Sequence, residues 1–364
     1  MKKVILLFLM IQLTVIACCG CGGKSNVLFP VMDKKTNKYG YINQKGNVII
    51  QCQYDNCAGF INGNAIVSKD GKWGVINRSG DMIVPLEYES INMISDKGIY
   101  QVLLNEKYGL VNEKGAVLVP LQFSKIEAYS GNIAWIKEKG ELYIYEIDTQ
   151  RTRKISNDLN IRAVSYIKDN LFAYTCGKMI NNLLWKHTPL LWSQKWGIID
   201  ISGNIILEEK YDLIIGYAEN RAMAYIADKN RDIETAYLLN EKGEVIKKFP
   251  KMQMTGYSSD GVAVLVNVET GREDAAIDKE GNWIFEPSKI RGTLCIQGNL
   301  LCEKRNLGTI YYNSDGEKLF ETDMDRTEYM NGYIVFQDEK EGSGLMNLSG
   351  DIVTRFPEGL EAVL

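Results

Sequence analysis

The sequence predicts an all-β protein of tandem three-stranded repeats, arranged as a propeller-like ring. Two observations support this prediction. A four-residue turn of the form Asn/Asp-x-x-Gly recurs eight times along the 364-residue chain, and short apolar segments flank its copies. Self-similarity at a fixed period is typical of repeat architectures, and closing the ring would remove exposed sheet edges. An open, twisted β-solenoid is the alternative, because the units are shorter than most propeller blades.

The recurring turn defines the repeat unit. Its copies start at Asn43, Asn77, Asn112, Asp200, Asn240, Asp278, Asn313 and Asn347. Their final glycines are 34 to 40 residues apart, except for one gap of 88 residues. This gap has room for one degenerate and enlarged unit, expected at residues 140–194, which gives about nine units over residues 27–364. Each copy is expected to be a hairpin turn, because Asn or Asp can hydrogen-bond its own backbone two residues on and Gly tolerates a left-handed conformation.

The strand before the clearest turns carries an aromatic residue followed by Gly, as in Trp73-Gly-Val-Ile76. Alternation places Trp73 and Val75 on one face and Gly74 and Ile76 on the other. Both faces are therefore apolar, so this strand is expected to be buried between neighbouring units. Trp73 is expected to be a buried contact between units, and Gly74 to leave space for an adjacent unit.

A second strand follows each turn, and a third strand follows a variable linker. Pro85, Pro120 and Pro287 are expected to close several of the second strands, since a proline that cannot donate to a ladder belongs at a strand end or a sheet edge. The chain begins and ends with an apolar segment of the third type, at residues 27–31 and 360–364. The sequence therefore predicts that the termini pair and close the ring.

The run from Lys72 to Tyr88 resembles the bacterial WG (Trp-Gly) repeat. The resemblance extends with decreasing fidelity from about Lys38 to the C-terminus, and later units keep the turn but replace the Trp-Gly pair. It implies a β-repeat assembly that mediates interactions. It transfers no catalytic residues.

The N-terminus predicts export and anchoring. Residues 1–17 combine a basic start with a short apolar stretch, as in a signal peptide. The following Val15-Ile-Ala-Cys18 resembles the lipobox of bacterial lipoproteins, in which the Cys becomes the lipid-bearing N-terminus. Residues 18–26 then read as a lipidated tether on an extracytoplasmic, membrane-anchored protein. A plain signal peptide with incidental cysteines is the alternative.

Composition argues against several classes of function. The net charge is −4 and there is no basic stripe, which disfavours nucleic-acid binding. The single histidine, His187, excludes the common histidine-based metal sites. No phosphate-binding or dinucleotide-binding motif is present, so no cofactor and no metal are expected.

Two cysteines are placed to form a disulfide. Cys295 and Cys302 are symmetric about an expected two-residue turn at Gly298-Asn299. Opposed residues of a hydrogen-bonded antiparallel pair lie about 5.5 Å apart, within the range that a disulfide spans. Two reduced, buried thiols are the alternative.

The degenerate unit contains an insert from Lys178 to Gln194. It holds Trp185, His187 and Trp192, and insertions in repeat proteins are often found on the binding face. These three residues are the candidate binding site, with the tryptophans as anchors. The alternative is an extra hairpin that covers a weak fourth unit.

Together these features predict a non-catalytic lipoprotein that presents a β-repeat surface to an envelope protein, peptide or glycan. One alternative is an enzyme that acts on envelope glycans, which requires two carboxylates about 5–10 Å apart. A structural envelope spacer is another.

Replacing Cys18 with Ala is expected to remove the lipid and release the protein from the membrane fraction, because the acyl chains provide the anchor. Cell fractionation and the mass of the N-terminal peptide measure this. A variant that stays in the membrane fraction, with an N-terminal peptide of unchanged mass, contradicts the lipoprotein prediction.

Overall fold

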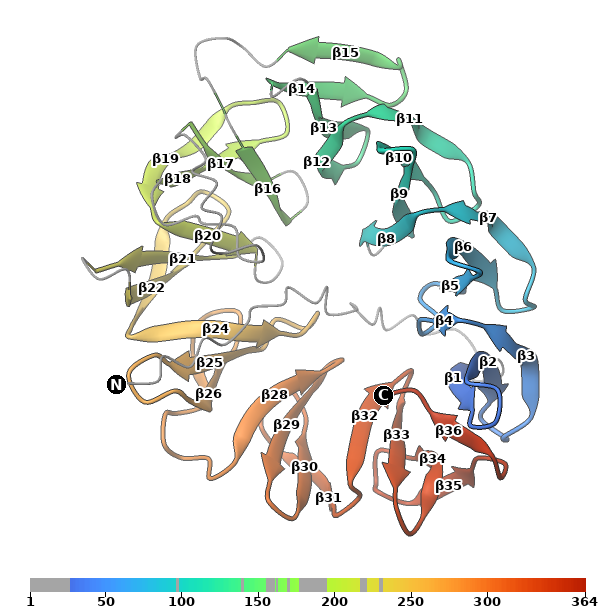
Figure 1. Cartoon of the computed structure of the whole chain (residues 1–364). Coiled ribbons are helices and arrows are strands. Elements are labelled where there is room, and N and C mark those ends of the chain that lie inside the picture. Colours follow the sequence, from blue (N-terminus) through green and yellow to red (C-terminus); the bar gives the residue numbers. More distant parts are fainter. Residues whose placement is uncertain are drawn as a thin grey trace, which may run out of the picture. The chain divides into compact units, whose positions relative to one another are not determined.

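The computed structural model describes residues 27–95, 98–138, 141–154, 161, 163–168, 171–176, 195–216, 221–228 and 232–364. Within these residues the fold is all-β, with nine four-stranded antiparallel sheets that are the blades of a β-propeller (Figure 1). The chain divides into two compact units, one containing residues 154–296 and the other residues 17–153 and 297–364. No helix among the described residues is long and apolar enough to cross a membrane.

The chain order of the strands follows their order in each sheet, except that the last strand joins the first blade. The first four blades in the chain contain β36 (Leu360–Ala362), β1 (Leu28–Asp33), β2 (Lys38–Asn43) and β3 (Val48–Tyr54); β4 (Asn56–Cys57), β5 (Asn64–Lys69), β6 (Lys72–Asn77) and β7 (Met82–Tyr88); β8 (Ser90–Ser95), β9 (Ile99–Leu104), β10 (Lys107–Val111) and β11 (Val117–Phe123); and β12 (Lys125–Ser130), β13 (Ile133–Glu138), β14 (Glu141–Glu146) and β15 (Arg151–Lys154).

The next three blades belong to the unit of residues 154–296. They contain β16 (Ala163–Lys168), β17 (Leu171–Thr175), β18 (Trp196–Asp200) and β19 (Ile205–Tyr211); β20 (Leu213–Gly216), β21 (Ala222–Ala227), β22 (Ile233–Leu239) and β23 (Val245–Pro250); and β24 (Met252–Tyr257), β25 (Ala263–Asn267), β26 (Arg272–Ile277) and β27 (Trp283–Phe285).

The last two blades complete the chain. They contain β28 (Thr293–Gln297), β29 (Leu300–Arg305), β30 (Gly308–Tyr312) and β31 (Lys318–Thr322); and β32 (Arg326–Met330), β33 (Tyr333–Asp338), β34 (Gly342–Met346) and β35 (Ile352–Arg355). In the order β4-β5-β6-β7 we call the first strand the inner strand and the last the outer strand.

Each blade has four strands, so the prediction of three strands per unit is wrong. The segment read as a variable linker is the inner strand, which pairs with the strand after it. In the second blade the inner strand β4 has only two residues, with Asn56 opposite Ser68 and Cys57 opposite Val67. A strand this short shows no alternation of apolar and polar residues, which is the signal that identifies strands in a sequence.

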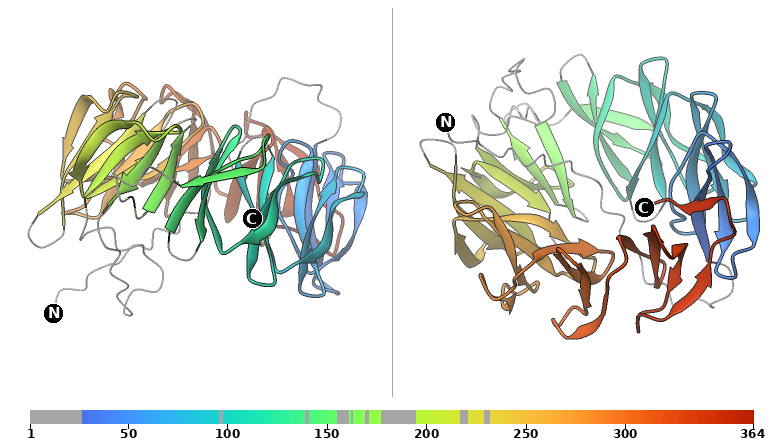
Figure 2. Two further views of the ribbon diagram at one scale, coloured as in Figure 1. Left: turned by 90° about the horizontal axis from the view of Figure 1, so that it is seen from above. Right: turned by 60° about the horizontal axis from the view of Figure 1, so that its bottom comes forward.

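The first and last strands pair, as the sequence predicts. Val31, Met32 and Asp33 of β1 lie opposite residues 362, 361 and 360 of β36. The right-hand view of Figure 2 shows the red C-terminal segment beside the blue first blade. The C-terminal strand β36 is an inner strand, however, whereas the sequence predicts another copy of the third strand.

All eight predicted turns form, with one shared hydrogen-bond pattern. In the second blade, Asn77 Oδ1 accepts the backbone N–H groups of Ser79 and Asp81, both at 2.9 Å, and Gly80 has φ of 87°. The other seven turns repeat the bonds to residues two and four further on. In the long gap, the β14–β15 turn replaces Gly with Gln150, at φ of 53°. One turn within this gap therefore lacks the glycine of the motif.

The glycine of each aromatic-Gly pair faces the outer strand of its own blade, which corrects the expectation that it faces an adjacent unit. Trp73 lies opposite Tyr88 and Val75 opposite Val84, so the outer strand bulges over Gly74. A Cβ on Gly74 would lie 2.7 Å from the carbonyl oxygen of Val84. Spacing along one strand does not reveal a bulge in its partner.

The contact with the adjacent blade is made instead by the turn glycine. A Cβ on Gly80 would lie 3.5 Å from Ile50 on β3 of the preceding blade, and one on Gly350 would lie 3.0 Å from Phe320 on β31. Each of these turns therefore rests on the outer strand of the preceding blade. A side chain at this position would also be strained by the positive φ.

Both faces of β6 are buried between blades, as predicted. Ile76 packs with Leu28 and Tyr41 of the first blade, and Val75 packs with Val102 of the third. Trp73 packs against the same cluster as Val75, as expected of a contact between units, but it is half-buried rather than buried. It lies near the start of β6, next to the β5–β6 hairpin, where the neighbouring blade covers it incompletely.

Two of the three prolines lie within their strands rather than at the ends, but both are in strands at a sheet edge, the other position expected for proline. Pro85 lies within β7 and Pro120 within β11, whereas Pro287 follows the end of β27. Since β7 and β11 are the outer strands of their sheets, proline's missing N–H removes no hydrogen bond to a further strand.

We expect Gly74→Ala to lower the free energy of unfolding by about 1–3 kcal/mol, since the new methyl group overpacks a backbone contact. Gly59→Ala is the matched control, because a Cβ there meets only Met330 at 3.9 Å and φ is not positive. This control is expected to leave stability unchanged or slightly raised. Chemical denaturation measures both, and equal effects would contradict the steric explanation.

Candidate binding site

The charged residues of the repeat motif are occupied in structural contacts. Asp55, in the corner between two blades, accepts the backbone N–H of Asp70 at 2.6 Å and forms an ion pair with Lys38. Their mutual hydrogen bond lowers the pKa of Asp55 and raises the pKa of Lys38. The same corner recurs at Asp212, which accepts Lys195 Nζ at 2.7 Å and Ala227 N at 3.0 Å. These groups hold neighbouring strands together. A candidate ligand site is therefore expected where the connections depart from the regular repeat.

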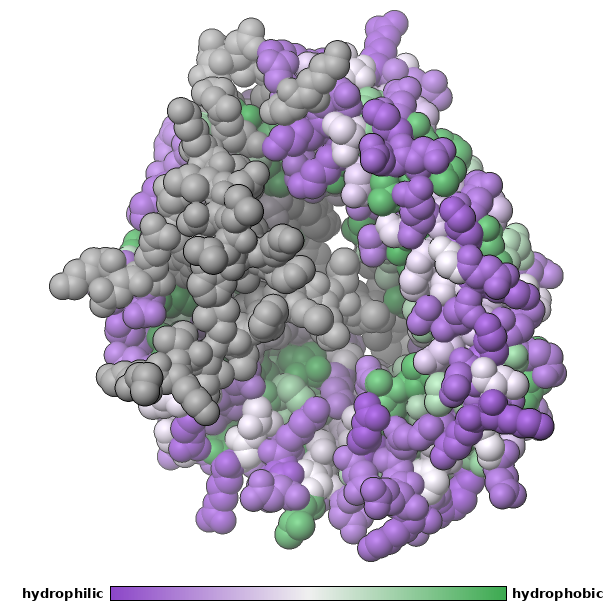
Figure 3. All heavy atoms as spheres, in the orientation of Figure 1, coloured by the Kyte–Doolittle hydropathy of each residue, from purple (hydrophilic) through white to green (hydrophobic). Residues whose placement is uncertain are grey.

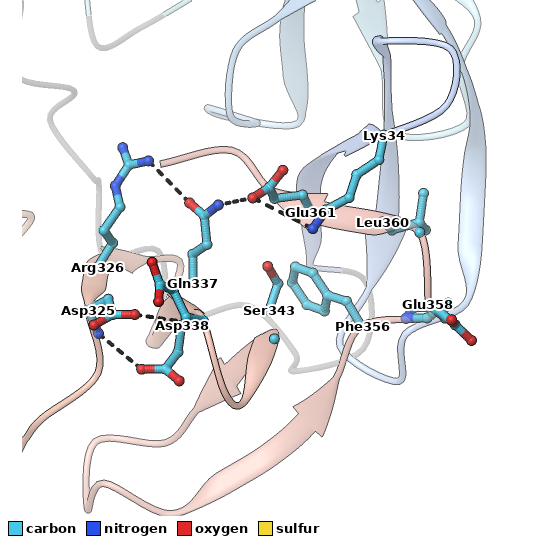
Figure 4. Close-up of a pocket in the computed structure, with 14 residues that line it drawn as sticks. Lys34, Asp325, Arg326, Gln337, Asp338, Ser343, Phe356, Glu358, Leu360 and Glu361 are labelled. Carbon is cyan, nitrogen blue, oxygen red and sulfur yellow. Dashed lines mark hydrogen bonds and ion pairs between the residues drawn. The ribbon is translucent and has the colours of Figure 1, made fainter.

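The repeat changes on both sides of the last blade. One residue connects β3 to β4, β7 to β8 and β11 to β12, but three residues connect β31 to β32 and four connect β35 to β36. These two longer connections line a cavity of about 530 Å³. The β1–β2 hairpin contributes Lys34 to its wall (Figure 4). The cavity therefore lies where the chain's two ends meet.

Gln337 holds one wall of this pocket together. Its Oε1 accepts a hydrogen bond from Arg326 Nη1 at 3.1 Å, and its Nε2 donates to Glu361 (Figure 4). Lys34 Nζ lies 3.9 Å from the same Glu361 oxygen. This chain of contacts links the β32–β33 hairpin to β36 and then to the β1–β2 hairpin.

Two aspartates of the pocket are fixed by backbone N–H groups. Asp338 Oδ1 accepts from Lys340 and Glu341, both at 2.8 Å, and Asp325 Oδ2 accepts from Glu339 at 2.9 Å. The Glu341 bond is the largest cause of the lowered pKa of Asp338. Its carboxylate therefore stays charged at neutral pH and is poorly suited to act as a general acid.

The rest of the lining combines an apolar floor with more acidic than basic side chains. Phe356 is buried and Leu360 half-buried, and Ser343 Oγ accepts the backbone N–H of Ala362 at 3.1 Å. Five acidic and two basic side chains line the pocket, a formal charge of −3. The arrangement suits a ligand with a positive charge beside an apolar segment.

The pocket contains none of the described residues that the sequence singled out as site candidates. Cys18, Trp185, His187 and Trp192 are outside the described residues, so the lipidation and the insert contact stay predictions. Cys295 is half-buried on β28 and Cys302 is buried on β29, the neighbouring strand of the same sheet. Their disulfide also stays a prediction. Among the described residues, no group of three or more His, Cys, Asp or Glu is placed to hold a metal ion.

Sequence reasoning did not find the pocket, because its residues share no motif. Lys34, Gln337 and Glu361 meet only when the first and last strands pair. Asp325 belongs to the short segment Asp323-Met-Asp325, which carries no recognisable motif. The available signal was the predicted pairing of the termini together with the longer connections beside the last blade.

Comparison with known proteins identifies the repeat. The family model for the WG containing repeat matches residues 39–73, 73–108, 108–143 and 196–229. No curated protein matches the chain.

Similar solved structures include a eukaryotic initiation factor, at 12% identity and a TM-score of 0.56, with 93% of this chain and 96% of that chain covered. Porphyromonas gingivalis dipeptidyl peptidase 4 has 8% identity and a TM-score of 0.48, with 82% of this chain and 58% of that one covered. The computationally designed Ika8 protein has 15% identity and a TM-score of 0.39, with 81% and 93% covered. At this identity, the likeness to the initiation factor shows the fold alone.

Replacing Ser343 with Ala is expected to lower stability by about 1–3 kcal/mol, since it leaves the buried N–H of Ala362 without its acceptor. Amide exchange should become faster at residues 360–362. The control is Ser349→Ala, whose exposed side chain lies in a turn. Similar exchange at residues 360–362 in both variants would show that Ser343 does not hold β36.

Proposed function

We propose that this chain, whose fold is a β-propeller and four of whose segments match the WG containing repeat, is a non-catalytic extracytoplasmic lipoprotein that binds a protein, peptide or glycan. The main support for this proposal is that the polar groups of the repeat already have hydrogen-bond partners within the protein. The turn Asn and Asp oxygens and the corner carboxylates already accept backbone N–H groups. The repeats supply a rigid scaffold, and ligand contacts belong to its irregular parts.

The pocket beside the last blade is our candidate ligand contact. Its volume of about 530 Å³ falls within the range of roughly 300–1,000 Å³ typical of small-ligand sites. Its excess of carboxylates favours a cationic group, and buried Phe356 offers apolar contact rather than an open platform for stacking a sugar. Among the three ligand classes, these features favour a Lys- or Arg-bearing segment of a peptide or protein.

The catalytic alternative has weaker support. A glycan hydrolase requires one carboxyl group that is protonated at neutral pH beside one that is charged. In the pocket, the pKa of Asp338 is lowered by backbone hydrogen bonds. Burial raises the pKa of Glu328 on β32, but Glu328 does not line the pocket. Release of new reducing ends from purified cell-wall glycan by the protein would favour the enzyme instead.

A charge reversal at the pocket mouth tests the binding proposal. Glu339 and Glu358 are exposed, and replacing both with Lys changes the formal charge of the lining from −3 to +1. Affinity for a fluorescent Lys-rich decapeptide is expected to fall by about tenfold or more, since like charges disfavour the complex. The control variant, Glu106→Lys with Asp315→Lys, makes the same change in net charge at exposed positions away from the pocket.

Fluorescence anisotropy at two salt concentrations measures these affinities, with a Glu-rich decapeptide as the second probe. The proposed contact requires that only the pocket variant loses affinity. Equal losses in both variants would mean that the peptide responds to net charge and that the pocket is not its site.

A further inference from the structure

Exposed apolar side chains gather where the outer strands leave the turns. In the unit of residues 17–153 and 297–364, most of its large exposed hydrophobic residues lie in these segments. They are Val48, Ile49, Met82, Val117, Leu319, Leu348, Ile352 and Val353, and we call them the turn rim. Figure 3 shows apolar patches within a mainly hydrophilic surface along the border formed by β3, β7 and β11.

Blade packing does not require apolar residues at these positions. On β3, Ile50 is 4% exposed and lies beneath the Gly80 turn of the next blade, while Val48 and Ile49 are 37% and 46% exposed. The packing contact therefore begins after the first two residues of the strand. Threonine would satisfy the preference for β-branched residues in strands without exposing as much apolar surface. We therefore attribute the apolar rim to contact with another surface.

The rim lies at the end of the first blade where the described chain begins. Leu28 of β1 is opposite Asn43, the first residue of the turn, so Val27 lies at the turn end. The β1–β2 hairpin and Lys34 lie at the other end of this sheet, about 20 Å away for a strand of this length. Nine residues, Cys18 to Asn26, precede Val27, and fully extended they span at most about 30 Å. The chain therefore enters the first blade at the turn end, from which a lipid on Cys18 reaches the bilayer by a shorter path than from the hairpin end.

We propose that the turn rim rests on the membrane surface, at the boundary between headgroups and acyl chains, and that the pocket end faces away from it. This inference depends on the lipid anchor of the proposed function. The turns of this unit carry charges of both signs, such as Lys45, Arg78, Glu113 and Asp351. Attraction to anionic lipid is therefore a minor contribution, and apolar contact is the main one.

Photo-crosslinking of the lipidated full-length protein tests this orientation. Vesicles of phosphatidylcholine would contain a phosphatidylcholine with a diazirine on its acyl chain, and crosslinked peptides would be mapped by mass spectrometry. Crosslinks are expected in segments 47–50 and 348–353. The β29–β30 hairpin is at the opposite end of its blade and serves as an internal control, since its Leu307 is 89% exposed.

Two variants make the test specific. Ile49→Ser with Val353→Ser is expected to reduce crosslinking of the rim by about fivefold, because membrane contact scales with the apolar area buried. Leu307→Ser removes an even more exposed apolar side chain and is expected to change nothing. Unaltered thermal unfolding confirms that the variants are folded. Adding anionic phosphatidylserine to the vesicles should leave the pattern unchanged.

The possible outcomes distinguish the proposed membrane contact of the rim from the proposed lipid anchor. Crosslinks confined to the N-terminal peptide, or equally strong at Leu307, would overturn the proposed orientation while leaving the anchor intact. Crosslinks between two protein chains at the rim would also overturn it and identify a second copy as the occupant. A wild-type N-terminal peptide without lipid mass would instead refute the lipoprotein itself.

Discussion

The fold depends on a turn whose hydrogen bonds are local and whose glycine lets it contact the preceding blade. The Asn or Asp oxygen supplies two backbone N–H groups with an acceptor, and Gly accepts the left-handed conformation that the turn requires. The glycine then allows the turn to rest on the preceding blade without a side chain between them. The same contact joins the chain ends, since the turn at Gly46 meets Thr354, whose Oγ1 donates to Gln44 O at 2.5 Å. One local motif therefore contributes to several seams between successive blades and to the seam between the termini.

Local features of the sequence predicted much of this architecture. The turn at Asn77 and the two apolar faces of β6 follow from hydrogen-bonding capacity and alternation, which are properties of one segment. The inner strand β4 could not be predicted, because Asn56 and Cys57 become a strand only through a partner. The role of Gly74 was assigned to the wrong neighbour because the bulge above it belongs to another strand. The pocket was missed for the same reason, since no single segment contains Lys34 and Glu361 together.

The regular and irregular parts of this molecule use their charged side chains differently. In the regular corners, Asp55 and Asp212 are committed to lysines and backbone N–H groups. Around the last blade the connections are longer, and carboxylates such as Glu339 and Glu358 remain exposed. A lengthened connection changes little in the packing of the sheets, because the bulges and turns that hold the blades lie outside it. Repeats of this kind thus allow a binding surface to vary while their core stays constant.

The pairing of β1 with β36 also sets the order in which the protein matures. The inner strand of the first blade is made from the last residues of the chain, with only Leu360–Ala362 in the pair. Synthesis from the N-terminus delivers β1 long before its partner, and the intervening chain must close a loop of some three hundred residues. Until then β1 has an open edge available for incorrect pairing. Without the strand Leu360–Ala362 that edge would stay open, so these three residues decide whether the first blade is complete.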